Sequence, residues 1–396
     1  MYDPFSAATR RDPAAAHARL RAECPVHHFA GFPPDGFFTL SRHADVAAAV
    51  RDTDRWSSRY GPGPVEQEPL GGGMLLSADP PLHTSQRRLV QKAFTPRRIA
   101  ELEPRVREIA TELLDGFAAD GEADLVEAFA YPLPVIVIAE LLGVPADDRA
   151  TFKRWSDDIV AGIGGDDGQA AASQAEFATY FVEAIGRRRA LQHAGAPLPD
   201  DLVSGLVEAE YEGRTLAVPE MLGILVQLLV AGNETTTSML TNVVRRLCED
   251  PALLAAVRDD PTVHEAAIEE SLRFDAPVMG LFRTANEPVT IDGTDIPAGA
   301  KVMLLYASAN RDDAVWDEPD RFRLDRNLVE LRRTHLSFGA GAHYCLGAPL
   351  ARLEGRVALG LLLERLPGLR LAGEPEPVPP FFLQGCGRLP VAWDPS

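Results

Sequence analysis

A glycine-rich segment near the C-terminal end of the chain holds the residue best able to do chemistry. It reads Phe338-Gly339-Ala340-Gly341-Ala342-His343-Tyr344-Cys345-Leu346-Gly347, and the apolar periodicity of residues 347–366 predicts a helix directly after it. The N-terminus of a helix favours a thiolate through the helix dipole and the free backbone N–H groups. Glycines let the backbone come close to both the sulfur and a flat ligand. We therefore expect Cys345 to ligate a metal ion.

Three other interpretations of this segment are weaker. A dinucleotide-binding loop needs GxGxxG, but Tyr344 stands where the third glycine belongs, and no clear strand leads in. A zinc site needs several Cys or His ligands at set spacings, and only His343 and Cys345 lie here. A buried, inert cysteine is the usual explanation for a lone cysteine, but it does not explain the pattern around this one.

A second constellation lies in a long helix predicted over residues 218–249, in the sequence Ala231-Gly232-Asn233-Glu234-Thr235-Thr236. Ala231 and Thr235 are one turn apart and share a face, and the small residues leave space for a flat macrocycle and a small gas. The Thr235 hydroxyl could hydrogen-bond back to the Ala231 carbonyl and open the helix locally. Glu234 beside it could relay protons from solvent. A purely structural, threonine-rich turn is the alternative.

Composition narrows the class of protein. The 396 residues carry a formal net charge of −19, which argues against nucleic acid as a partner because its binders present a basic stripe. Residues 1–21 lack the apolar stretch of a signal peptide, and the apolar run 221–232 is too short to cross a bilayer. The four cysteines are scattered without CxxC spacing. We expect a soluble, cytoplasmic enzyme without membrane insertion.

Periodicity predicts a mostly helical protein with a small sheet. Helical spacing of apolar residues appears at 45–51, 96–118, 131–142, 218–249, 261–273 and 347–366. Strand signals are few: residues 37–40, 301–305, and a hairpin over 289–296 that turns at Asp292-Gly293.

Two proline- and glycine-rich stretches predict loops. Residues 61–73 lie in a connection between Trp56 and Leu76 that is unusually long, so we expect a lid over a site, with disorder as the alternative. Residues 373–380 predict a late connection before a final short hairpin.

The cysteine segment resembles the haem-binding loop of the cytochrome P450 monooxygenases, since it matches the family's FGxGxHxCLG pattern at every fixed position. The resemblance implies a mainly α fold with a small β region: a triangular helical prism in which the haem lies between a long distal helix and the proximal cysteine loop. It implies one domain over residues 1–396, with β-rich parts near 30–60, 285–305 and 375–395. It also implies heme b (iron protoporphyrin IX) with Cys345 as the iron ligand, a thiolate that favours O–O cleavage.

Residues carried over from the family fill three roles. Glu234 and Thr235 match the acid and alcohol that deliver protons, with Glu234 standing where aspartate is also common. Glu270 and Arg273 match the ExxR motif, whose third partner is implied to be Arg321 of Pro319-Asp320-Arg321-Phe322 in a structural triad; an ordinary surface pair is the alternative. The implied cofactor-binding residues are His83, Arg87, Arg283 and His343 at the propionates, with Ala231, Phe338 and Gly347 along the haem.

Substrate and partners follow partly from the residues and partly from the resemblance. The expected substrate wall is mainly apolar, so we expect a hydrophobic small molecule; the alternative is that several of these residues belong to the core. The wall comprises residues 57–76, Leu228, Ala231, Gly232, residues 278–282 and residues 381–383. The family implies a ferredoxin-type electron donor with its NAD(P)H-dependent reductase. A basic docking patch for that donor is expected from four arginines, and a merely solvated face is the alternative: Arg332, Arg333, Arg352 and Arg356.

The expected activity is insertion of one oxygen atom from O2 into a C–H bond or a double bond. A peroxide-driven relative would usually lack the acid and alcohol pair that Glu234 and Thr235 supply. A haem-based gas sensor should carry an effector domain, for which the sequence gives no signal.

Overall fold

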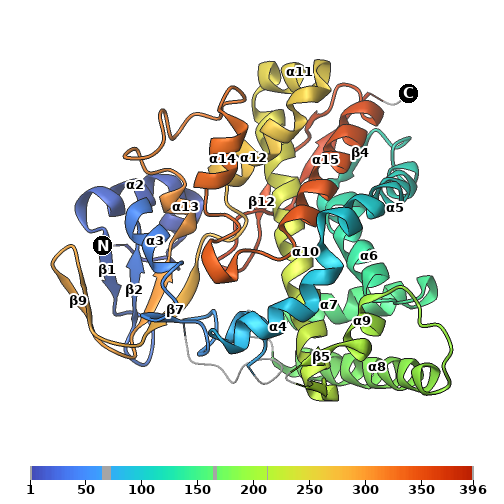
Figure 1. Cartoon of the computed structure of the whole chain (residues 1–396). Helices are drawn as coiled ribbons and strands as arrows, with labels where there is room; N and C mark the ends of the chain where they lie inside the picture. The colour runs from blue at the N-terminus through green and yellow to red at the C-terminus, as the bar shows by residue number, and fades with distance from the viewer. Residues whose placement is uncertain (1, 65–72, 164–166, 212, 395–396) are drawn as a thin grey trace.

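The helix α10 (Val218–Glu249) runs through the helical part of the molecule, with the helix that follows the cysteine loop, α15 (Ala348–Arg365), beside it (Figure 1). The computed structural model describes residues 2–64, 73–163, 167–211 and 213–394. Both helices were predicted to within two residues because each has a proline in its first turn and apolar residues at helical spacing.

The remaining helices surround this pair or cover the sheet. Those nearest the N-terminus are α1 (Ala7–Arg11), α2 (Pro13–Glu23), α3 (His43–Ala49), α4 (Leu82–Gln91), α5 (Pro96–Asp115) and α6 (Pro132–Leu141). The others are α7 (Arg149–Ile163), α8 (Asp167–His193), α9 (Leu202–Glu208), α11 (Pro251–Asp259), α12 (His264–Phe274), α13 (Tyr306–Ala309) and α14 (Leu328–Thr334). The predicted helices at 45–51, 96–118, 131–142 and 261–273 correspond to α3, α5, α6 and η5 (Pro261–Val263) with α12.

A five-stranded sheet lies at the opposite side of the molecule, to the left in Figure 1. Its order is β1 (Val26–Phe29), β2 (Phe37–Leu40), β10 (Lys301–Leu304), β7 (Leu281–Ala285) and β3 (Trp56–Ser57). The predicted hairpin is β8 (Val289–Ile291) with β9 (Thr294–Ile296); Asp292 and Gly293 turn with φ of 48° and 75°, the left-handed pair of a two-residue hairpin loop.

Short strands near the C-terminus form smaller sheets. β11 (Arg370–Leu371), β14 (Pro390–Ala392) and β4 (Glu122–Asp124) make one. β12 (Glu376–Pro377) pairs with β13 (Cys386–Arg388), so the first strand of this pair lies inside residues 373–380, which were predicted to be a connection. The expected lid falls partly on residues 65–72, which lie outside the described residues. In the part of the chain that the structure describes, no helix is both long and apolar enough to cross a membrane.

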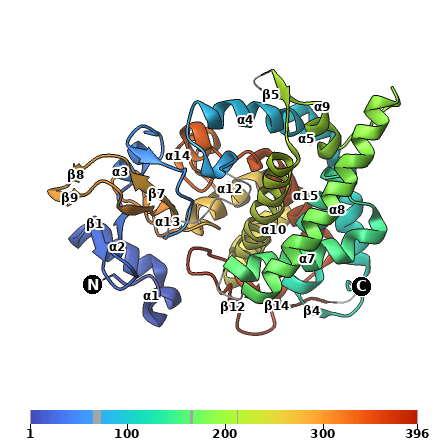
Figure 2. The ribbon, with the colours of Figure 1, turned by 90° about the horizontal axis from the view of Figure 1, so that it is seen from below.

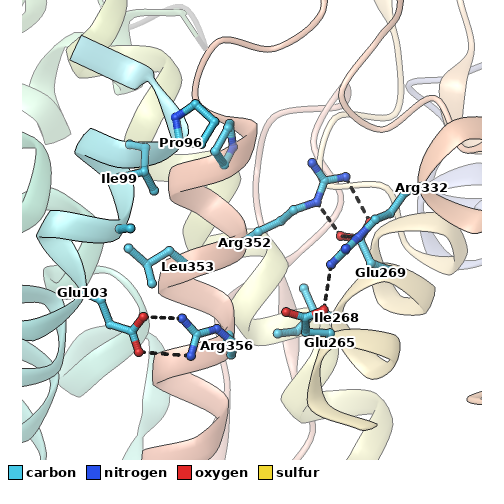
Figure 3. Close-up of a pocket in the computed structure, with 12 residues that line it drawn as sticks. Pro96, Ile99, Glu103, Glu265, Ile268, Glu269, Arg332, Arg352, Leu353 and Arg356 are labelled. Carbon is cyan, nitrogen blue, oxygen red and sulfur yellow. Dashed lines mark hydrogen bonds and ion pairs between the residues drawn. The ribbon is translucent and has the colours of Figure 1, made fainter. Parts of the chain in front are cut away.

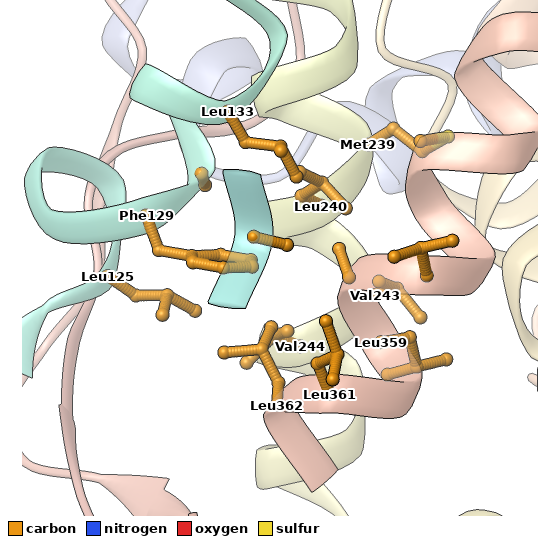
Figure 4. Packing of buried hydrophobic residues seen from close by; sticks show 14 of the residues in the cluster. Leu125, Phe129, Leu133, Met239, Leu240, Val243, Val244, Leu359, Leu361 and Leu362 are labelled. Carbon is orange, nitrogen blue, oxygen red and sulfur yellow. The ribbon is translucent and has the colours of Figure 1, made fainter. Parts of the chain in front are cut away.

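The core that joins α10 to α15 fixes the elements on which the candidate site is built. Leu240, Val243 and Val244 of α10 pack with Leu359 and Leu362 of α15, as Figure 4 shows. Phe129, from the segment before α6, and Leu133, in the first turn of α6, also belong to this cluster. Because truncating one such leucine to alanine costs about 2–5 kcal/mol, the relative position of the two helices is strongly determined.

One carboxyl group lies inside this core. Glu354 of α15 is 2% exposed, and its Oε2 has no hydrogen-bond partner among the described residues. Burial raises the pKa of Glu354 to about 8, because the apolar surroundings disfavour the charged form. Glu354 is therefore neutral in the folded protein at pH 7.

We predict that Glu354→Gln flattens the pH dependence of stability. The unfolded chain releases this proton near pH 4.3, whereas the folded chain keeps it up to about pH 8. The unfolded state thus binds fewer protons in that interval. The free energy of unfolding therefore falls as pH rises, and by pH 7 it is roughly 4 kcal/mol lower than at pH values below 4. Unfolding measured from pH 5 to 8 should show this slope in the wild type and in Glu364→Gln, an exposed control on α15, but not in Glu354→Gln. Parallel curves for all three proteins would contradict the prediction.

Candidate functional site

The cysteine loop is a closed turn that ends at the N-terminus of α15. The Cys345 N–H donates to the Phe338 carbonyl at 2.8 Å, and Gly339 and Gly341 have φ of 66° and 67°, which side-chain-bearing residues rarely adopt. A Cβ on Gly341 would lie 3.2 Å from the Cα of Arg51, so this glycine also permits close packing against the end of α3. The loop therefore holds Cys345 in one place.

Burial and nearby positive groups act on the Cys345 thiol in opposite directions. Burial raises the pKa of the Cys345 thiol, while backbone N–H groups of Gly347 and Ala348 and the positive charges of Arg87 and Arg352 oppose that rise. A coordinating metal ion deprotonates such a thiol outright. The Cys345 side chain is nevertheless exposed, so no other side chain covers it. This donor fits an iron ion and does not fit a packed, inert cysteine.

Basic groups gather near Cys345 from three parts of the chain. His83 and Arg87 lie one turn apart on α4, Arg283 lies on β7, and His343 lies in the cysteine loop. The rings of His83 and His343 are 3.9 Å apart. Burial and then the positive charges of Arg283, His83 and Arg87 lower the pKa of His343 to about 2, which shows that the four groups act on one another. They form one cluster.

This basic cluster, made of His83, Arg87, Arg283 and His343, fits a ligand with two carboxylates. Burial, followed by Arg87, lowers the pKa of His83 to about 4, so both histidines are neutral donors and the two guanidinium groups carry the charge. Nδ1 of His83 is buried without a partner, and Arg87 makes no hydrogen bond or ion pair with another described residue. Arg283 donates only to the Phe282 carbonyl, at 2.9 Å. Two propionates would satisfy these groups.

The face of α10 that carries Thr235 has the predicted hydrogen bond. The Thr235 Oγ1 donates to the Ala231 carbonyl at 2.8 Å, and Ala231 itself is exposed. The helix remains continuous here, so the expected local opening is not observed. Gly232 faces α6, since a Cβ on it would meet Ile138 at 3.8 Å; its small size serves helix packing more than open space.

Glu234 is half-buried beside α7. Burial raises the pKa of Glu234, the negative charge of Asp157 raises it further, and Lys153 opposes the rise. Packing fixes this neighbourhood, because Asn233 donates to the Ser156 hydroxyl at 2.5 Å. Lys153 binds Asp157 at 3.0 Å, and both are partly exposed. A carboxyl with a raised pKa, next to groups that reach solvent, can hold and pass on a proton.

The pair predicted on α12 is present, but its third partner is a different arginine. Arg273 donates to both Glu270 oxygens, at 2.8 and 2.7 Å, and both side chains are fully buried. Arg326 completes the triad, with its Nε 3.1 Å from Glu270 Oε1. The assignment of Arg321 was wrong: its side chain is exposed and pairs with Glu318, and only its backbone carbonyl reaches Arg273.

A groove runs alongside α15, between α5 and α12, and Figure 3 shows its charged walls. Arg352 and Arg332 both bind Glu269, and Arg356 binds Glu103 at 2.6 Å (Figure 3). Three of the four arginines expected to form a basic patch are therefore neutralised by carboxylates. The groove is therefore not an uncompensated positive surface; Arg333 alone of the four has no ion pair among the described residues.

Glu269, which pairs with arginines on both sides of this groove, was not predicted. Burial by itself raises the pKa of Glu269, but hydrogen bonds from His335 and Arg352 outweigh it and lower that pKa to about 2. Arg352 also donates to the Tyr344 hydroxyl at 3.1 Å and lies over the Phe338 ring, 4.6 Å from its centre. The groove thus touches the cysteine loop directly.

The expected substrate wall is partly core. Phe282 is buried in a hydrophobic cluster with Phe37 and Leu20, as the core alternative predicts, and Phe381 is partly buried and packs against that cluster. Strand alternation explains Phe282, because its side chain points away from that of Leu281. The stretches 278–282 and 381–383 nevertheless lie together, since Val278 pairs with Leu383 and the Met279 N–H donates to the Phe382 carbonyl at 2.8 Å.

Comparison with known proteins shows to which family the chain belongs. The family model described as Cytochrome P450 matches residues 163–367. The cytochrome P450 monooxygenase PikC of Streptomyces venezuelae is 40% identical over 392 residues, which cover 96% of this chain and 91% of PikC. This chain belongs to the cytochrome P450 family. The P450 is therefore a monooxygenase, an oxidoreductase whose family binds haem through a cysteine thiolate.

Other relatives and solved structures agree on the fold of this P450. The mycinamicin IV hydroxylase/epoxidase of Micromonospora griseorubida is 42% identical over 379 residues, covering 91% of each chain. The structure of cytochrome P450 CYP109Q5 from Chondromyces apiculatus superimposes with a TM-score of 0.90 at 38% identity, covering 100% of this chain and 98% of that one. The predicted fold class is confirmed.

Arg326 and Arg321 can be compared directly as third partners of the buried pair. Arg326→Ala removes a nearly buried partner of a fully buried carboxylate and should lower the free energy of unfolding by about 3 kcal/mol, with less haem-loaded protein. Arg321→Ala removes an exposed side chain and should stay within about 0.5 kcal/mol of the wild type. Thermal unfolding and the yield of haem-loaded protein measure both. The reverse ranking would restore the Arg321 assignment.

Proposed function

We propose that this P450 inserts one oxygen atom from O2 into a hydrophobic small molecule, by hydroxylation or epoxidation. The observation that carries the proposal is the Glu234 and Thr235 pair on α10, with the Thr235 hydroxyl bonded to the Ala231 carbonyl. This pair and Cys345 come from separate elements that the core holds in fixed positions.

The cofactor proposed is heme b, held by Cys345 at the iron and by the basic cluster at its two propionates. Haem supplies the oxygen-activating and electron-accepting chemistry when bound. Arg87 and Arg283 match the two propionate charges, and the neutral His83 and His343 donate hydrogen bonds. Ala231 on the distal side, and Phe338 and Gly347 in the cysteine loop, are proposed to line the haem faces; a Cβ on Gly347 would lie 3.9 Å from the sulfur.

Proton handling is assigned to Glu234 and Thr235. Glu234 holds a proton at neutral pH more readily than an exposed glutamate, because burial and Asp157 raise its pKa. Lys153 and Asp157 give the carboxyl a polar neighbourhood that reaches solvent. The Thr235 hydroxyl keeps a fixed orientation through its bond to Ala231, so it can receive a hydrogen bond on the distal side.

Electrons are proposed to come from a separate ferredoxin-type donor with its NAD(P)H-dependent reductase. The groove beside the cysteine loop is the proposed docking face, since Arg352 connects it to Tyr344 next to Cys345. We further propose a single domain over residues 1–396 and a cytoplasmic location, in keeping with four free cysteines.

The proposed substrate is hydrophobic because apolar residues dominate the stretches 278–282 and 381–383 that meet beside α10. Relatives are named for vitamin D(3) 25-hydroxylation and for mycinamicin IV, and CYP109E1 of Bacillus megaterium was solved with testosterone and with corticosterone. These names support a role in secondary metabolism, with a hydrophobic substrate like the compounds that they print.

Cys345→Ser should abolish thiolate ligation. The reduced, carbon monoxide-bound wild type should show the red-shifted Soret band of a thiolate ligand, and the variant should lose it. Cys24→Ser is the matched control, since Cys24 is an exposed cysteine on another element and should leave the band unchanged. A red-shifted band in Cys345→Ser would refute the assignment of the ligand.

Thr235→Ala should uncouple oxygen consumption from product formation. Loss of the positioned hydroxyl should lower product formation by about a hundredfold, while NAD(P)H oxidation continues and hydrogen peroxide accumulates. Thr235→Ser keeps a hydroxyl and should retain most of the coupling. The assay uses a compound that shifts the spin state of the oxidised enzyme and measures peroxide and product per NAD(P)H. Full coupling in Thr235→Ala would contradict the assignment of proton delivery to Thr235.

A further inference from the structure

The N-terminal segment contacts a turn near the opposite end of the chain. Arg10 of α1 donates to the Pro379 carbonyl at 2.9 Å, and the Phe5 and Phe381 rings lie 4.5 Å apart. In Figure 2, α1 lies next to the red C-terminal loop region beyond β12. The turn over residues 379–383, called here the C-terminal turn, therefore rests on residues that the proposed function does not use.

Local structure fixes the position of Phe5 before it reaches the C-terminal turn. The Phe5 N–H donates to the Asp3 carboxylate at 2.8 Å, and Ser6 caps α1 by accepting from the Thr9 N–H at 3.2 Å. The Phe5 ring stacks on Phe32 at 5.5 Å with planes 13° apart. Phe5 thus lies between the β1–β2 connection and the C-terminal turn.

The far side of the C-terminal turn is bound to α10 and to the 278–282 stretch. The Gln384 carbonyl accepts from the Asn242 side chain at 2.8 Å, and the Gln384 N–H donates to the Pro277 carbonyl at 2.9 Å. A Cβ on Gly385 would lie 2.8 Å from the Cα of Ser238, so backbone meets backbone there. Ser238 is one turn beyond Glu234 and Thr235 on α10.

The two ends of the C-terminal turn are held with different strength. Its C-terminal end is fixed by hydrogen bonds to buried groups and by contact with α10. The Phe381 side of the turn contacts the N-terminal segment through a partly exposed aromatic contact and one exposed guanidinium bond, in addition to its packing on the cluster of Phe37 and Phe282. Because the Phe382 carbonyl stays bonded to the Met279 N–H, loss of the N-terminal contacts should loosen the Phe381 side chain while leaving α10 unchanged.

We propose that Phe5 and Arg10 are positioning residues for ligand selection: they hold the C-terminal turn against the 278–282 stretch and so set the size of ligand that the distal side accepts. The inference rests on the proposed function, in which these two stretches border the substrate. Phe5 and Arg10 themselves touch neither substrate nor haem.

Two iron-binding probes of different size test the proposal on the haem-loaded protein. Imidazole is small enough to bind the iron without reaching the C-terminal turn, and 4-phenylimidazole carries a ring that needs a preformed wall. Their dissociation constants are read from the Soret shift. Phe5→Ala and Arg10→Ala should weaken 4-phenylimidazole binding by about threefold to tenfold, the range that one aromatic contact supplies, and leave imidazole unchanged.

Controls separate positioning from loss of structure. Arg11→Ala removes the neighbouring exposed arginine of α1 and should change neither constant. Thermal unfolding of each variant, and its carbon monoxide spectrum, should match those of Arg11→Ala. If Phe5→Ala does not load haem, Arg10→Ala supplies the same comparison. The double variant of Phe5→Ala with Phe381→Ala should be no weaker for 4-phenylimidazole than Phe381→Ala alone, because both act through one contact.

The carbon monoxide spectrum of the wild type tests the proposed function, and the two dissociation constants test the positioning role. A wild type without a red-shifted carbon monoxide band would overturn the haem-thiolate assignment, and with it the basis of the positioning role of Phe5 and Arg10. If the wild type is normal and the variants weaken both probes equally, or change neither, only the positioning role is overturned.

Discussion

A fully buried ion pair supports the proximal side of this P450. Glu270 and Arg273 on α12 face each other without exposure to solvent, and removing either one would leave an uncompensated buried charge. Their remaining hydrogen-bonding groups reach the segment that leads to the cysteine loop: Arg273 donates to the Asn310 and Pro319 carbonyls, at 2.9 Å each. The pair is therefore satisfied only when that segment is in place.

The cysteine loop is attached to α12 through a second set of hydrogen bonds. Asn310 accepts from the Leu336 N–H at 2.7 Å and donates to the Ser337 hydroxyl at 2.8 Å, and that hydroxyl donates to the Leu272 carbonyl at 2.5 Å. The position of Cys345 is therefore set by α12 at the start of the cysteine loop and by α15 at its end. On the distal side, the core between α10 and α15 sets the place of Thr235 in the same way. Cys345 and Thr235, the proposed ligand and proton donor, are therefore fixed by rigid elements and not by the loops alone.

The features that the sequence could predict are those with a local physical cause. Gly339 and Gly341 need left-handed backbone, Asp292-Gly293 needs a two-residue turn, and Thr235 can bond only to a carbonyl one turn back. The helix α8 was not predicted, because its alanine-rich sequence shows no clear apolar stripe. Arg326 was missed because the loop offers several arginines without periodicity, and only folding shows which one reaches Glu270. The contact of Phe381 with Phe5 was missed for a similar reason, since the two residues are distant in sequence.

The basic cluster has a consequence for the life of the protein before it acquires its cofactor. Arg87 and Arg283 bring two positive charges into one partly desolvated region, and neither forms an ion pair among the described residues. Under the proposed assignment, a dianionic ligand that binds only the folded chain would relieve this repulsion and add its own binding free energy to folding. The cluster combines residues of α4, β7 and the cysteine loop, so nearly the whole chain would have to be synthesised before that relief is available. Supply of the proposed cofactor would then set the stability of the folded chain, and with it the fraction of chains exposed to degradation.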